Sequence, residues 1–166
     1  MNKVLRKGYN FIEVVMIILI IGILAGLSIP RFASFSMIKL SGAVKKTVSD
    51  IRYIQQLAIS QHQDYYLNFN AITDTYEARR VLDNAYAIDP FTRANMQTNF
   101  TTDPQYRGID ITGVNFGGTS SLRFNWKGEP QDANGNPLTN SGWINLSYGG
   151  NNITIYISPN TGRINW

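Results

Sequence analysis

The residue types that carry chemistry in enzymes are scarce in this chain, and their spacing supports no catalytic group. Its 166 residues include one histidine, His62, and no cysteine. The lack of cysteine excludes disulfides, thiolate nucleophiles and cysteine-ligated metals. His62 is the one histidine that a serine nucleophile could use as its base, and the carboxylates are scattered. The sequence therefore predicts no catalytic site and no cofactor, and His62 is interpreted as a surface or capping residue at a helix end.

One polar cluster has the residue types of a cation site. Asp132, Asn134 and Asn136 alternate with small residues in a glycine-containing loop, and alternating oxygen ligands in such a loop can chelate calcium. The twelfth position of this loop is Trp143, where an EF-hand carries a bidentate glutamate. The pattern favours an Asx-rich turn and predicts no metal, with a calcium loop as the alternative.

A group of basic residues could contact nucleic-acid phosphates from one predicted helix. The formal net charge is +4, but three of the 15 basic residues precede the long apolar run described next. The remaining 12 are nearly balanced by 11 acidic residues, so the charge does not favour nucleic acid as a partner. A solvated helix face or subunit contacts are the preferred interpretation, and DNA contact is the alternative, for Lys39, Lys45, Lys46 and Arg52.

Glu13 lies at the beginning of an apolar run that is long enough to cross a membrane as a helix. No charged residue occurs between positions 14 and 29, and the run counted from Phe11 matches a hydrocarbon core of about 30 Å. The basic residues ahead of it predict a cytoplasmic N-terminus. A carboxylate within a membrane helix costs a few kcal/mol, so Glu13 is expected to be functional and to need a partner.

Two ordinary interpretations of this run leave Glu13 unexplained. A secretory signal peptide has a shorter apolar core followed by a small-residue cleavage site, for which Gly26-Leu27-Ser28 is a weak candidate. A signal anchor tolerates the length but gives no reason for a glutamate inside the span.

The segment Lys7-Gly8-Tyr9-Asn10-Phe11-Ile12-Glu13 resembles the leader junction of type IV prepilins and type II secretion pseudopilins. The resemblance implies that a membrane peptidase cuts after Gly8 and methylates the new amine of Tyr9. It also implies that Glu13 pairs with the amine of a neighbouring subunit during filament assembly. Tyr9 replaces the phenylalanine most common after the cut, and Asn10-Phe11 replaces the usual threonine-leucine.

A second helical pattern follows the apolar run. In the same family, helix-weakening residues fall at the positions of Gly22 and Pro30, and we expect a bent helix that continues to about Gln61. At 1.5 Å per residue this helix would be on the order of 80 Å long. Apolar residues recur at intervals of three and four residues, which predicts that one face of the helix is buried. These residues are Leu40, Val44, Val48, Ile51, Ile54 and Ala58.

Beyond His62 the pattern becomes that of short strands and polar turns. A hairpin is predicted over residues 65–69 and 75–79, then a loop-rich stretch from Asp83 to Pro104. Further strands are predicted at residues 108–114, 121–126, 142–147, 152–158 and 162–166. The helix around residues 51–59, this hairpin and the strands over 122–128, 143–146 and 153–163 resemble the GspH/FimT group of minor pseudopilins and minor pilins.

The predicted fold class is α+β, a long N-terminal helix packed on a mainly antiparallel β-sheet domain. The expected division is a leader over 1–8, an assembly helix over 9–30, an amphipathic half over 31–62 and a β-rich domain over 63–166. The resemblance implies a filament subunit of the minor kind, which primes the filament or forms its tip. It would be held first in the inner membrane with its globular domain in the periplasm. Its implied partners are a prepilin peptidase/methyltransferase, other pilin subunits, and an assembly platform with its ATPase. The alternatives are a DNA- or ligand-binding minor pilin, a major pilin, and a signal-anchored periplasmic enzyme.

Overall fold

The structure is a computed structural model that describes residues 10–28 and 32–166. Gly8, Tyr9 and Pro30, for which the sequence predicts cleavage, methylation and a helix bend, lie outside the described residues. The chain forms two compact units, residues 1–35 and residues 36–166. Each unit is considered by itself.

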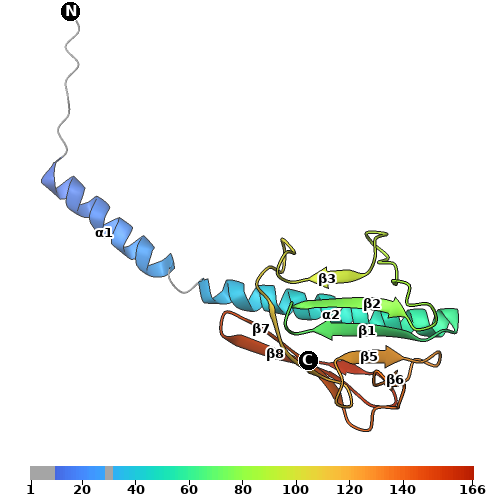
Figure 1. Cartoon of the computed structure of the whole chain (residues 1–166). Helices are drawn as coiled ribbons and strands as arrows, with labels where there is room; N and C mark the ends of the chain where they lie inside the picture. Colours follow the sequence, from blue (N-terminus) through green and yellow to red (C-terminus); the bar gives the residue numbers. More distant parts are fainter. Residues whose placement is uncertain (1–9, 29–31) are drawn as a thin grey trace, which may run out of the picture. The chain divides into compact units, whose positions relative to one another are not determined.

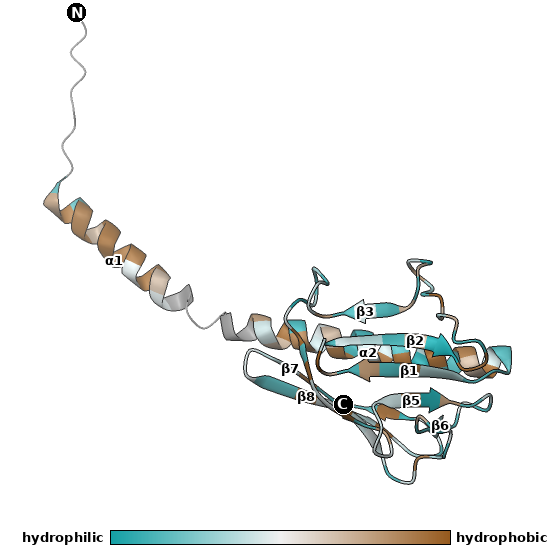
Figure 2. Cartoon of the chain, in the orientation of Figure 1, coloured by the Kyte–Doolittle hydropathy of each residue, from teal (hydrophilic) through white to brown (hydrophobic). Residues whose placement is uncertain are grey.

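The first unit contains helix α1, Phe11–Ser28, whose ribbon mostly carries the brown of hydrophobic residues (Figure 2). The helix begins where the amides of Glu13 and Val14 donate to the carbonyl of Asn10, at 2.9 and 3.3 Å. Its large hydrophobic side chains, between Phe11 and Leu24, are 43% to 83% exposed. Among residues 10–28 and 32–166, no helix meets the length and apolarity needed to cross a membrane.

Helix α2, Phe32–Gln61, carries the core stripe of the second unit. Its β-branched and leucine positions recur every three or four residues, so they line one face, and their opposite face carries lysines and glutamines. The predicted apolar positions are all buried, together with Ala43 and Thr47. Thr47 satisfies its buried hydroxyl by donating to the carbonyl of Ala43 at 3.0 Å.

Two antiparallel sheets accompany this helix (Figure 1). The five-stranded sheet has the order β3-β2-β1-β5-β6, with bounds Gln97–Asn99, Thr75–Arg80, Tyr65–Asn70, Ser121–Phe124 and Pro130–Gln131. The four-stranded sheet has the order β4-β7-β8-β9, with bounds Asp110–Asn115, Gly142–Tyr148, Asn151–Ile157 and Ile164–Asn165. Strands adjacent along the chain, β1 with β2 and β7 with β8, are joined by tight turns.

A single cluster of buried side chains joins α2 to both sheets. Leu67 and Ala78 enter it from the five-stranded sheet, and Ile144 and Ile155 enter it from the four-stranded sheet. Among the described residues, every buried hydrophobic side chain lies between Leu40 and Ile164. Residues 36–166 therefore contain their own complete core, and the predicted α+β class is confirmed.

The seven predicted strands are found at or near their predicted places, but the described residues contain nine strands, and three corrections follow. The stretch from Asp83 to Pro104, predicted as a loop, contains β3, which pairs with β2. The two-residue strand β6 was not predicted. The last strand is shorter than predicted and covers only Ile164–Asn165. All three are edge strands, whose formation depends on the neighbour they pair with rather than on their own sequence.

Gln55 ties two of the polar loops to α2. Its side-chain amide donates to the carbonyls of Gly128 and Thr161, at 2.8 and 3.1 Å. Gly128 has a φ of +82°, and a Cβ there would lie 2.6 Å from Cδ1 of Ile59. Glycine is therefore required at this turn both for the left-handed backbone and for the close approach to the helix.

Tyr76 has its hydroxyl group in the core, where the hydroxyl finds a hydrogen-bond acceptor. This side chain is buried, and its hydroxyl donates to Oδ2 of Asp50 at 2.5 Å. Lys46 Nζ binds the same carboxylate oxygen at 2.8 Å. Burial, followed by the neighbouring charge of Asp50, raises the pKa of Tyr76 well above its ordinary value.

We predict that the stability of residues 36–166 falls at alkaline pH in part because of Tyr76. A raised pKa in the folded state gives stability that is complete below the ordinary tyrosine value of about 10 and is lost above it, by on the order of 1 kcal/mol per pH unit. Tyr76→Phe should lower stability at pH 7 by about 1 kcal/mol, through the lost hydrogen bond, and should flatten the alkaline decline. Urea unfolding between pH 7 and 11 measures both effects.

Tyr156→Phe is the matched control, because Tyr156 is 49% exposed on β8. It should leave both the neutral stability and the alkaline decline unchanged. An equal alkaline decline in Tyr76→Phe and in the unsubstituted protein would contradict the role given to Tyr76.

Candidate functional site

Glu13 is the one charged residue of α1 and lies in its first turn. Among the described residues its carboxylate has no hydrogen bond or ion pair, and its side chain is exposed. Gly22 lies within the continuous α1, and a Cβ built there would meet nothing within 4 Å. The assembly role of Glu13 and the bend at Gly22 stay predictions.

The four basic residues of α2 differ in their contacts. Lys39 donates to the carbonyl of Arg107 at 2.5 Å and lies 4.6 Å from the ring centre of Tyr148. Lys46 is paired with Asp50. Lys45 and Arg52 are exposed, and Arg52 lies 6.0 Å from the ring centre of Trp166. Two of the four cations are thus engaged within the second unit, and DNA contact stays the alternative prediction.

The loop of Asp132, Asn134 and Asn136 is closed by its own hydrogen bonds. Oδ1 of Asp132 accepts from the backbone amides of Asn134 and Asn136, both at 2.9 Å, and Oδ2 accepts from the Asn136 side chain at 3.1 Å. The Asn136 amide and then the backbone amides of the loop hold the pKa of Asp132 below its ordinary value. The geometry is that of the Asx-rich turn that the sequence favours, with the carboxylate directed at loop donors.

His62 follows the last residue of α2 and has a left-handed φ of 53°. Its amide is 3.4 Å from the carbonyl of Ile59, as at a helix C-terminus. The imidazole ring stacks on Trp126, with 5.6 Å between ring centres. His62 therefore ends the helix and contacts an exposed tryptophan.

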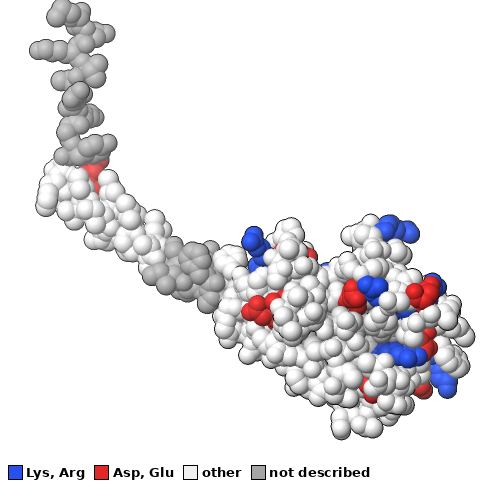
Figure 3. Space-filling model, in the orientation of Figure 1, with Lys and Arg blue, Asp and Glu red and all other residues white. Residues whose placement is uncertain are grey.

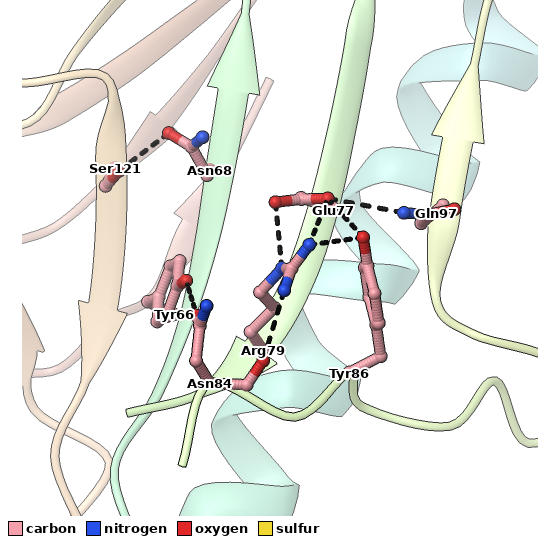
Figure 4. Close-up of polar contacts among 8 residues, drawn as sticks. All are labelled: Tyr66, Asn68, Glu77, Arg79, Asn84, Tyr86, Gln97 and Ser121. Atoms are coloured by element: carbon pink, nitrogen blue, oxygen red, sulfur yellow. Dashed lines mark hydrogen bonds and ion pairs between the residues drawn. The ribbon is translucent and has the colours of Figure 1, made fainter. Parts of the chain in front are cut away.

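The outer face of the five-stranded sheet carries a polar network that the sequence analysis did not identify (Figure 4). We call Glu77, Arg79, Tyr86 and Gln97 the outer-face network. Arg79 donates to Glu77 from Nε at 2.9 Å and also donates to the Tyr86 hydroxyl. Tyr86 and Gln97 donate to Oε2 of Glu77 at 3.2 and 3.3 Å.

The outer-face network fixes the ionisation of Glu77. Partial burial raises its pKa, but the hydrogen bonds from Arg79 and Gln97 outweigh burial, and the pKa of Glu77 lies below its ordinary value. The pair of Glu77 and Arg79 is thus a neutral unit at pH 7. Further polar pairs extend the same face (Figure 4): Tyr66 with Asn84 at 2.5 Å, and Ser121 with Asn68 at 2.8 Å.

The sequence signal for this face was the period-two alternation within the first hairpin. In residues 65–70 the odd-numbered side chains are buried and the even-numbered ones are partly or fully exposed. The even-numbered residues are Tyr66, Asn68 and Asn70. That alternation predicts a polar outer face. Contacts across it could not be predicted, since they depend on the pairing of β1, β2 and β3.

Charges on the visible face of residues 36–166 are mixed rather than segregated (Figure 3). Four ion pairs occur among the described residues: Lys46–Asp50, Arg79–Glu77, Arg80–Asp83 and Arg123–Asp64. Such interspersed charge gives no large field of one sign.

Comparison with known proteins gives one informative result. No protein-family model and no curated protein sequence matches the chain. Among solved structures it is similar to the minor pseudopilin EpsH from the Type 2 Secretion System of Vibrio cholerae, with a TM-score of 0.55 and 11% sequence identity. The match covers 76% of this chain and 94% of that one. The chain therefore has the pseudopilin fold, a helix packed on antiparallel sheets, as the resemblance in the sequence predicts.

Proposed function

We propose that this chain is a structural subunit of a type II secretion pseudopilus or a type IV pilus, of the minor kind that begins or caps the filament. The observation that carries the proposal is the occurrence of a pseudopilin fold behind an apolar helix with one carboxylate in its first turn. The function is mechanical, and we propose no catalysed reaction.

The exposed surface of α1 supports a role in assembly. Its large side chains, from Phe11 to Leu24, have no core of their own to enter. Apolar surface on every side of a helix is stable only when lipid or other apolar surface covers it. We propose that the inner membrane covers the sequence from Phe11 to Ile29 before assembly, and that the helices of neighbouring subunits cover it in the filament.

In the proposal, Glu13 determines how neighbouring subunits align along their α1 helices. An unpaired carboxylate in an apolar filament core would be strongly destabilising, and an ammonium group from a neighbouring subunit removes most of that cost. Cleavage after Gly8 would create such an amine on Tyr9, four residues before Glu13. A prepilin peptidase/methyltransferase would perform this step, and a platform protein with its ATPase would extract the subunit into the filament.

The first prediction concerns the mature N-terminus. Protein isolated from the membrane fraction of cells that express a type II secretion system should begin at Tyr9 and carry one added methyl group. Intact mass and N-terminal sequencing measure this directly. A chain that begins at Met1 would support a signal anchor, and a cut after Ser28 would support a secretory signal; either result contradicts the proposal.

The second prediction concerns Glu13. Glu13→Gln keeps the side-chain size and removes the charge, so the subunit should still be cleaved and folded but should enter filaments at least about tenfold less. Glu129→Gln is the matched control, because Glu129 is exposed and its Oε2 accepts a hydrogen bond from Asn125 on the same turn. Quantitative immunoblots of sheared filaments measure incorporation, and equal incorporation of both variants would refute the role of Glu13.

A further inference from the structure

The outer face of the five-stranded sheet contains a shallow hollow of about 330 Å³, which lies beside the outer-face network. Two cross-strand rows line it. In the first row Thr75 on β2 lies between Asn70 on β1 and Asn99 on β3. In the second row Glu77 lies between Asn68 and Gln97. With strands about 4.8 Å apart, the outer members of each row are roughly 10 Å from each other.

Local hydrogen bonds fix the orientation of the asparagine side chains. Oδ1 of Asn70 accepts from the backbone amides of Ile72 and Thr73, at 2.9 and 3.2 Å. Oδ1 of Asn99 accepts from the backbone amides of Thr101 and Thr102, at 2.9 and 3.2 Å. Only an oxygen can accept from a backbone N–H, so each carboxamide must direct its NH₂ group away from the turn.

These NH₂ groups are donors without an acceptor among the described residues. The same holds for Asn68, whose Oδ1 accepts from Ser121 at 2.8 Å and whose NH₂ group makes no further bond. Glu77 already accepts four hydrogen bonds, from Arg79, Tyr86 and Gln97. The hollow therefore offers the oriented amide donors of Asn70 and Asn99 to a molecule outside the chain. The amide of Asn68 and the carbonyl oxygen of Gln97 add a third donor and an acceptor.

The charge of the hollow indicates which classes of ligand could bind there. Its one ionised group, Glu77, is neutralised by Arg79, and Arg79 also donates to Tyr86 and to the carbonyl of Asn84. No described cation of the hollow is left to pair with phosphate, so nucleic acid is disfavoured. Nor does the lining contain an exposed apolar side chain that would hold a lipid or an apolar peptide. Hydroxyl groups spaced over a few ångströms accept from such donors without needing a charge.

We propose that this hollow binds a neutral saccharide, whose hydroxyl and ring oxygens accept hydrogen bonds from Asn68, Asn70 and Asn99. The two turns preorient the donors of Asn70 and Asn99, so little entropy of these two side chains is lost on binding. The site would give a filament subunit a ligand of its own, and it is independent of whether the chain polymerises. Free sugars and cell-wall glycans share this chemistry.

The test uses ¹⁵N-labelled residues 36–166, which contain their own core. Maltose, lactose, cellobiose and chitobiose are titrated into it to millimolar concentration, and the side-chain NH₂ signals of the three asparagines are followed. At least one sugar should shift these signals in a saturable manner. No shift with any of the four sugars overturns the proposal, and so does a shift produced only by a single-stranded oligonucleotide.

The decisive variant is Asn70→Asp with Asn99→Asp. Aspartate keeps the oxygen that accepts from each turn, so the fold should be retained, but each substitution replaces an NH₂ donor by an oxygen. Affinity should fall at least about tenfold. Asn134→Asp with Asn160→Asp adds the same charge in turns outside the hollow and should not change affinity. Equal affinity in the two double variants overturns the proposal.

Purified peptidoglycan and free disaccharide then distinguish the two sources. Retention of residues 36–166 on peptidoglycan that the Asn70→Asp, Asn99→Asp variant loses assigns the site to cell-wall glycan. Saturable binding of a free disaccharide without such retention assigns it to soluble sugar.

Discussion

The second unit depends on one constraint, which is that the apolar stripe of α2 must be removed from water. Leu40, Val44 and Ile51 on that stripe are completely buried, and both sheets contribute to the cluster that covers them. Most of the stability of an amphipathic helix in a protein comes from packing of its apolar face rather than from helix propensity. The sheets in turn contribute isoleucine, leucine and phenylalanine side chains from their inner faces to the same cluster. Helix and sheets are therefore stable only together.

Burial of the inner faces also determines what the outer face can be. Because strand side chains alternate, placing Leu67 and Phe69 in the core directs Asn68 and Asn70 outward. The partner strand obeys the same rule, so Tyr76 and Ala78 enter the core while Glu77 and Arg79 face outward. The polar character of the outer face, including the outer-face network and the hollow, is thus a consequence of how the core is filled. Core packing does not determine which polar residues occupy that face.

Features that are local in the sequence could be predicted, and features made by strand pairing could not. The stripe of α2 is contained in one segment, so the intervals between its apolar residues reveal it. The roles given to Gly8 and Glu13 stay predictions. The hollow joins Asn70, Thr75 and Asn99 from three strands, and β3 itself was predicted as loop because three residues carry too little pattern. Asn70 follows the first strand of the predicted hairpin and Asn99 lies in the predicted loop-rich stretch, but which of their side-chain atoms remain free depends on the folded geometry.

The two units differ in whether their apolar side chains are buried within the chain. This difference suits the chain to the proposed function of a filament subunit. Residues 36–166 satisfy their apolar groups within themselves, so this unit can fold before any neighbour is present. Helix α1 leaves large apolar side chains such as Ile12 and Ile18 more than half exposed. Assembly can therefore draw its driving force from α1 while leaving the folded body unchanged. A body that is stable by itself is also free to carry polar groups on its outer sheet face, because subunit packing through α1 does not require that face to be apolar.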